Sequence, residues 1–175
     1  MALTQTNLGN ALCQQGLRSD GAKAAELLSQ AVAAYRSSLE VFTREQLPQN
    51  WALTQGNLGA ALEEQSVRTG GAESTELLAQ AVAAYRSVLE VYTREQLPQD
   101  WAMTQNNLGA VLWAQAARTE GTKGAALLAQ AVAALHSCLE IYTPEAFPLD
   151  HKRAQEQLME CERLLTQAKV QAQQP

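Results

Sequence analysis

Apolar residues recur at three- and four-residue steps along most of the chain, a spacing typical of amphipathic α-helices. One stripe in the middle of the chain consists of Trp51, Leu58, Ala61, Leu62 and Gln65. A wider stripe follows, consisting of Leu77, Leu78, Ala81, Val82, Tyr85, Val88, Leu89 and Tyr92. The width of the second stripe predicts a helix that is covered by neighbours on two sides.

Glycine and proline separate these stripes and predict where the helices end. The segment RTGG at 68–71 lies between them, and glycine readily adopts the left-handed backbone that ends a helix. Pro98 disfavours helix at Leu97, and Asp100 can cap the helix that follows. Similar signals predict seven helices, over residues 2–18, 23–45, 50–68, 73–95, 100–118, 123–143 and 149–170. No alternating apolar run or hairpin turn competes with them, so the expected fold class is all-α.

The whole pattern repeats every 50 residues. Residues 1–50 are identical to 51–100 at 34 of 50 positions, and 51–100 to 101–150 at 29 of 50. Pairs of helices that stack on one another share a continuous core, which predicts a helical solenoid. We expect one domain over 1–175, with units 1–50, 51–100 and 101–148, a capping helix at 149–170 and a short disordered tail at 171–175.

Each unit carries Leu-Gly in its first helix, and the first two carry Ala-x-x-x-Tyr in the second, as in Leu58-Gly59 and Ala81 to Tyr85, with Pro98 beyond. This motif resembles the tetratricopeptide repeat, and NNLG at 106–109 is similar to its kinesin-light-chain type and bacterial relatives. The resemblance implies a right-handed solenoid of three 50-residue helix-turn-helix units plus a capping helix. It departs from the family in length, because the family unit has about 34 residues.

The resemblance also implies a concave groove lined by the first helix of each unit. In proteins with this repeat, an Asn just before the Leu-Gly pair binds the backbone or terminal carboxylate of a peptide. Asn7, Asn57 and Asn107 match that position, and Asn10 matches a further groove position. An amide offers both donors and acceptors to an extended peptide. The alternative is that these Asn side chains only bridge neighbouring first helices.

The groove positions that differ between units are where specificity is expected. The third unit offers Asn106 and Trp113, and the second offers Glu63 and Glu64. A large ring off the core face suits an anchor for a partner side chain, or else it packs against a neighbouring helix. The two glutamates favour a basic ligand, or else they lie on a solvated face.

Composition and charge narrow the classes of function. The net charge of −5 argues against nucleic acid and anionic membranes as partners, and no apolar run approaches the roughly 20 residues of a membrane span. Cys13, Cys138 and Cys161 lie far apart, and no signal peptide is visible, so we expect free thiols in a cytoplasmic chain. We find no nucleophile–base set, zinc spacing or phosphate loop, and therefore expect no enzyme activity, no cofactor and no metal.

The sequence therefore predicts a non-enzymatic scaffold that binds a protein or an extended peptide segment in its groove. The alternative is a structural or self-assembling repeat segment of a larger multidomain bacterial signalling protein. Self-association is a further expectation, through the first helix, where Leu3, Leu8 and Leu17 lack a preceding unit to cover them.

Overall fold

The computed structural model describes residues 2–171, and every regular element in that range is an α-helix. The helices are α1 (Ala2–Leu17), α2 (Gly21–Leu39), α3 (Pro48–Arg68), α4 (Gly71–Leu89), α5 (Pro98–Ala116), α6 (Gly121–Leu139) and α7 (Pro148–Gln171). The all-α class and the seven helices are thus as predicted. The expected tail began at 171, but Gln171 belongs to α7, and residues 172–175 lie outside the described range.

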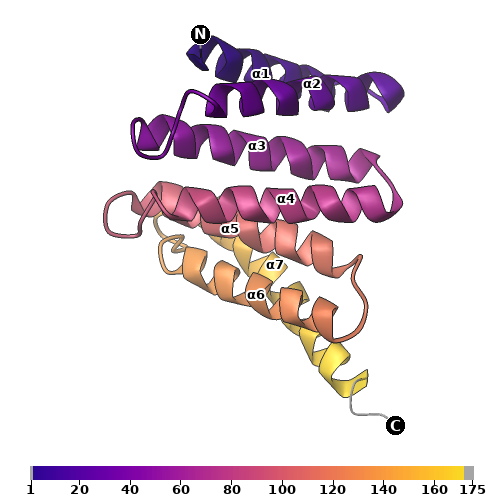
Figure 1. Cartoon of the computed structure of the whole chain (residues 1–175). Helices are drawn as coiled ribbons and strands as arrows, with labels where there is room; N and C mark the ends of the chain where they lie inside the picture. The colour runs from indigo at the N-terminus through magenta and orange to yellow at the C-terminus, as the bar shows by residue number, and fades with distance from the viewer. Residues whose placement is uncertain (1, 172–175) are drawn as a thin grey trace. The chain divides into compact units, whose positions relative to one another are not determined.

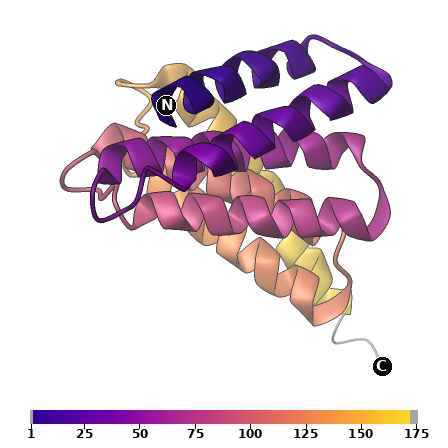
Figure 2. The same ribbon diagram turned by 45° about the horizontal axis from the view of Figure 1, so that its top comes forward.

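The chain forms two compact units, one ending at Val91 with α1 to α4 and one beginning at Tyr92 with α5 to α7. Within the first unit each helix packs against the next, and α3 also touches α1 (Figures 1 and 2). Within the second unit α5 packs against α6 and α6 against α7, while α7 also approaches α5. Consecutive packing of this kind is compatible with a helical repeat.

Glycines let the first and second helices of each 50-residue repeat approach closely. A β-carbon added at Gly9 would stand 2.6 Å from the ring of Tyr35, and one added at Gly59 would stand 3.1 Å from the ring of Tyr85. In the second compact unit, Leu135 takes the place of the tyrosine against Gly109. The Leu-Gly positions of the first helices therefore pack on the aromatic or leucine positions of the second.

A buried group of hydroxyls joins the first three helices. The Oγ1 of Thr6 lies 2.7 Å from the Oγ of Ser38 and 3.4 Å from the Oγ1 of Thr54. Ser38 donates to the carbonyl of Ala2, and Thr54 donates to that of Asn50. Each hydroxyl is therefore satisfied where water cannot reach it, which removes the penalty for burying it.

The second helices are shorter than predicted, ending at Leu39, Leu89 and Leu139 rather than at 45, 95 and 143. The reason is a separate turn that follows each of them. The Oγ1 of Thr43 accepts a hydrogen bond from the N–H of Gln46, and the N–H of Leu47 donates to the carbonyl of Thr43. Thr93 and Thr143 repeat this arrangement. The pattern Thr-x-x-Gln in the first two units is a known helix-start signal.

Two expected helix ends are also displaced. Helix α5 begins at Pro98 with Leu97 as the capping residue, so Asp100 lies in the first turn and is not the cap. Proline fits there because the first helical residue needs no N–H partner. In the segment RTGG, the left-handed residue is Gly71, which opens α4 with φ +62°, whereas Gly70 is extended. The glycine that permits the turn therefore starts the second helix.

Candidate functional site

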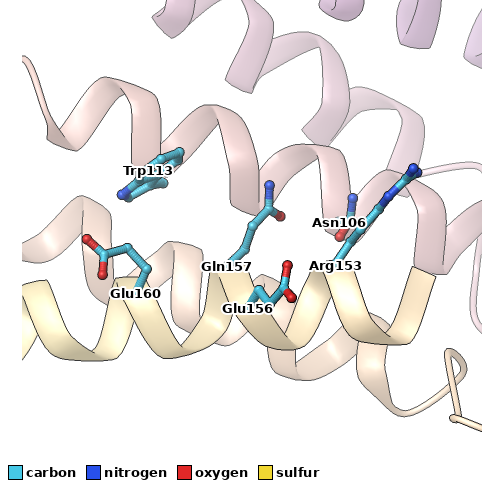
Figure 3. A pocket seen from close by; sticks show the side chains of 6 residues that line it. All are labelled: Asn106, Trp113, Arg153, Glu156, Gln157 and Glu160. Carbon is cyan, nitrogen blue, oxygen red and sulfur yellow. The ribbon is translucent and has the colours of Figure 1, made fainter. Parts of the chain in front are cut away.

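A pocket of about 380 Å³ lies between α5 and α7 in the second compact unit (Figure 3). Asn106 and Trp113 line it from α5. Its other wall is one face of α7, formed by Arg153, Glu156, Gln157 and Glu160. Two residues that the sequence singled out, Asn106 and Trp113, are therefore brought together with four that it did not.

The helical period explains why these residues share the pocket. The four α7 residues have the spacing i, i+3, i+4 and i+7, which places them on one face of the helix. The buried residues of α7 are Ala154, Leu158 and Cys161, and α7 packs mainly against α6. Asn106 and Trp113 are seven positions apart, two turns or about 10 Å along α5. The pocket is thus an elongated site with polar groups along its length.

The indole of Trp113 forms the apolar wall at one end of the pocket. Its side chain lies across from Glu160, whereas Asn106 and Arg153 lie together at the other end (Figure 3). Trp113 is 36% exposed, although it is one of the largest apolar residues of the chain. An aromatic ring held on a helix and left partly open is a good anchor surface for a partner's side chain.

Gln157 lines this pocket and carries an unsatisfied hydrogen-bond acceptor. Its Oε1 atom is buried and has no hydrogen-bond partner within the described residues. A buried carbonyl without a partner costs about 1–3 kcal/mol of folding free energy. Because this oxygen is closed to solvent, a bound molecule can supply the missing donor once the amide turns toward the pocket.

Two of the charged side chains that line the pocket, Glu156 and Glu160, are paired along α7. Both oxygens of Glu160 accept hydrogen bonds from Arg163, at 2.7 and 2.6 Å, and this pairing lowers the pKa of the Glu160 carboxyl. Lys152 lies 4.0 Å from Glu156. Both pairs join residues of α7 to one another, so neither involves the indole of Trp113.

The three asparagines that precede the Leu-Gly pairs, Asn7, Asn57 and Asn107, have different surroundings. The Nδ2 of Asn57 donates to the Oδ1 of Asn10 at 3.0 Å, and the hydroxyl of Tyr35 donates to the same oxygen at 2.8 Å. Asn57 thus bridges α3 and α1, which is the alternative that the sequence left open. Asn7 is exposed on α1, and Asn107 is half-buried on α5 but does not line the pocket.

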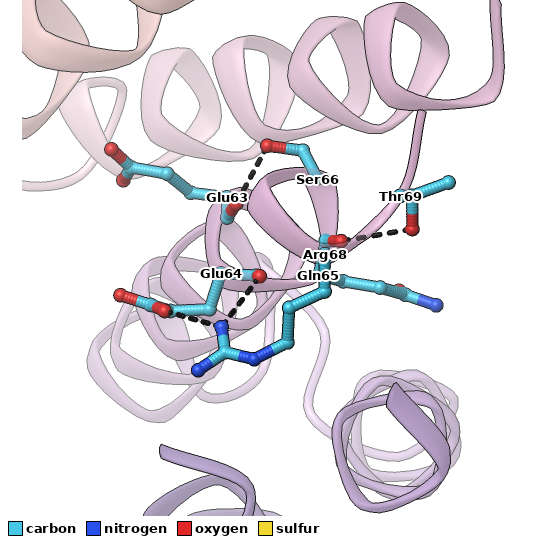
Figure 4. Close-up of polar contacts among 6 residues, drawn as sticks. All are labelled: Glu63, Glu64, Gln65, Ser66, Arg68 and Thr69. Atoms are coloured by element: carbon cyan, nitrogen blue, oxygen red, sulfur yellow. Dashed lines mark hydrogen bonds and ion pairs between the residues drawn. The ribbon is translucent and has the colours of Figure 1, made fainter. Parts of the chain in front are cut away.

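Glu63 and Glu64 lie on α3 with distinct surroundings (Figure 4). Glu64 pairs with Arg68 at 2.9 Å, whereas the Glu63 carboxylate points away from that guanidinium. Burial raises the pKa of the Glu63 carboxyl to about 7, and the neighbouring Glu64 adds to this effect. Glu63 therefore titrates near neutral pH, while Glu64 keeps a cationic partner.

The sequence contained a signal for the residues that were missed. Gln157 stands 50 positions after Asn107, so it occupies on α7 the position that Asn107 occupies on α5. Residues 151–175 align weakly with the start of a fourth unit, and this alignment places an amide of α7 at the position of Asn107. The prediction of only a capping helix at 149–170 left this amide without a role.

No family model matches the chain, and neither does any of the curated proteins with which it was compared. Among the described residues, none of the helices combines the length and the apolar character that crossing a membrane requires.

Proposed function

We propose that this protein is a non-enzymatic scaffold that binds an extended peptide segment of a partner protein. The α5–α7 pocket is one binding subsite of its groove. The observation that carries this proposal is the buried, unpartnered Oε1 of Gln157 beside the partly open ring of Trp113. An extended peptide supplies a backbone N–H to the first and a side chain to the second. The charged groups at the rim then contact the flanking residues.

The proposed architecture is a right-handed solenoid of long tetratricopeptide-like units, in which α7 serves as the first helix of a fourth. The 50-residue period and the close approach of Gly9 to Tyr35 and of Gly59 to Tyr85 support this resemblance. In this arrangement the first helices face the ligand and the second helices form the outer layer. A cytoplasmic location and a partner other than nucleic acid or membrane are part of the same proposal, consistent with the net charge of −5.

The proposal is tested by selecting linear peptides from a displayed random library with the whole chain as bait. The dissociation constant of each selected peptide is then measured for the wild type, Trp113→Ala and Met159→Ala. Met159 is a matched control, because it is 61% exposed on α7 and does not line the pocket. We expect Trp113→Ala to weaken binding at least tenfold, as removal of an anchor residue does, and Met159→Ala to leave it within twofold.

A second candidate function is a structural or self-assembling segment of a larger bacterial signalling protein. Exposed leucines on α1 favour it, since Leu3, Leu8 and Leu17 are 59%, 48% and 47% exposed. If this is the function, library selection should give no peptide that depends on Trp113. Sedimentation velocity of the unmodified chain should then show association that rises with concentration.

A further inference from the structure

Besides the contact between Thr6 and Thr54, four polar side-chain contacts tie the second repeat to the first within the α1–α4 unit. Two involve α3: Gln65 donates to Ser29 at 2.9 Å, and Asn57 donates to Asn10 at 3.0 Å. The other two involve arginines of the first repeat: Arg36 donates to Gln80 at 2.7 Å, and Arg44 forms an ion pair with Glu90. In these contacts the second repeat uses the side chains of Asn57, Gln65, Gln80 and Glu90.

The same four residue types stand 50 positions earlier, at Asn7, Gln15, Gln30 and Glu40. All four are exposed, and within residues 2–171 their side chains make no hydrogen bond or ion pair to another helix. Gln30 bonds only to Glu26 one turn away, whereas Gln80 bonds both to Glu76 one turn away and to Arg36 of the first repeat. The first repeat thus carries the same four polar residues, and in the described range no other helix contacts their side chains with a hydrogen bond or ion pair.

The apolar residues between these polar groups are likewise covered in the second repeat and exposed in the first. Leu58 is 8% exposed and Ala61 is fully buried in α3, where α2 packs against that helix. Their counterparts on α1 are Leu8, which is 48% exposed, and Ala11, which is also exposed. We call the surface formed by Asn7, Leu8, Ala11, Gln15, Gln30 and Glu40 the receiving face.

We propose that the receiving face binds a helical hairpin of this same repeat type, whose second helix presents the residues that α2 presents to α3. The partner's chemistry follows from the four contacts. Its second helix carries an apolar stripe, a small hydroxyl in the place of Ser29 and an arginine in the place of Arg36. The turn after that helix carries an arginine in the place of Arg44, and its first helix carries an amide in the place of Asn10. The inference does not depend on peptide binding in the α5–α7 pocket.

The last repeat of a second copy is a poor occupant. It has Ala129, His136 and Pro144 where the first repeat has Ser29, Arg36 and Arg44. In addition, α6 packs against α7, and the Nε2 of His136 lies 3.4 Å from a carboxylate oxygen of Glu162. The chemistry that the receiving face requires is therefore missing from the end of this chain that would meet it in head-to-tail stacking.

The test uses the full chain with an additional copy of residues 1–50 joined in front of it, compared with the original chain by urea unfolding. Leu8→Gln and Leu3→Gln are made in the original part of both. Leu3 is the matched control, because it and its counterparts Leu53 and Met103 are 59%, 52% and 48% exposed, so this position stays open in every repeat. We expect Leu8→Gln to lower the urea midpoint clearly in the extended chain and hardly at all in the original chain.

Two results overturn the proposal. One is an extended chain in which Leu8→Gln and Leu3→Gln shift the midpoint equally, because the added hairpin then does not cover Leu8. The other is a dimer of the original chain, seen by sedimentation equilibrium, that Leu8→Gln dissociates and Leu3→Gln does not. That outcome makes a second copy the occupant of the receiving face.

Discussion

Gly9 lies directly beneath the ring of Tyr35, so that a β-carbon at position 9 would stand 2.6 to 2.9 Å from three ring carbons. The ring has little freedom to move, because Tyr35 is only 2% exposed and its hydroxyl is bonded to Asn10. The contact joins α1 to α2 and explains why the first helix of each repeat has glycine at this position. It is a packing requirement, distinct from the conformational freedom that glycine supplies in turns.

Replacing Gly9 by Ala should therefore destabilise the fold by about 1–3 kcal/mol, the usual range for adding a carbon to a filled core. The matched control is Gly56→Ala in α3, where a β-carbon would meet Val88 at an ordinary 3.8 Å. That change should stabilise by about 0.5–1 kcal/mol, because alanine is the better helix residue. Urea unfolding measures both, and equal effects of the same sign would contradict the packing described.

The helices could be predicted from the sequence because each helix of the 50-residue unit occurs three times along the chain, with the same apolar spacing. Helix ends were less predictable. The turn at Thr43 was missed because the apolar stripe of α2 continues beyond the end of that helix at Leu39 to Phe42, which is buried although it lies outside the helix. Only two of the six pocket residues, Asn106 and Trp113, stand out by sequence, whereas Gln157 enters the pocket because α7 comes to lie opposite them.

Glu63 should make the stability of the fold depend on pH. Its carboxyl has a pKa raised from 4.5 to about 7 in the folded chain, so the folded state holds a proton that the unfolded state releases. The free energy of unfolding should fall as pH rises from about 4.5 to about 7, by an amount on the order of 2 kcal/mol. In Glu63→Gln this loss should disappear, whereas the exposed Glu45→Gln should keep it. Urea unfolding between pH 4.5 and 8 measures the difference, and parallel curves for wild type and Glu63→Gln would show that Glu63 is not the cause.

Gln157→Leu should separate a ligand-binding role from a structural one. Leucine has a similar size and removes the buried oxygen that lacks a partner, so the fold should become up to about 1 kcal/mol more stable or stay unchanged. The affinity for a selected peptide should instead drop about fivefold or more, because a hydrogen bond to the peptide is lost. Unfolding and binding are measured on the same preparation. A less stable variant with unchanged affinity would assign Gln157 a structural role.

The cysteines report whether α7 is packed as described. Cys138 and Cys161 are buried, and burial raises the pKa of their thiols to about 12 and about 11. Cys13 is only half-buried. A thiol reagent at pH 8 should therefore modify Cys13 first in the native protein and all three cysteines in denaturant. Modification of Cys161 as fast as Cys13 would mean that α7 does not stay packed on α6.

The most direct test of peptide binding in the α5–α7 pocket uses the indole N–H signals in a ¹H–¹⁵N NMR spectrum. The chain has three tryptophans, and Trp51 and Trp101 do not line the pocket, so they serve as internal references. The signal of Trp113 is identified by its absence in Trp113→Phe. On titration with a peptide selected on the wild-type chain, we expect the Trp113 signal to shift progressively to saturation while the other two stay in place. A Trp113 signal that does not move at a peptide concentration that saturates the chain would show that the peptide does not bind in this pocket.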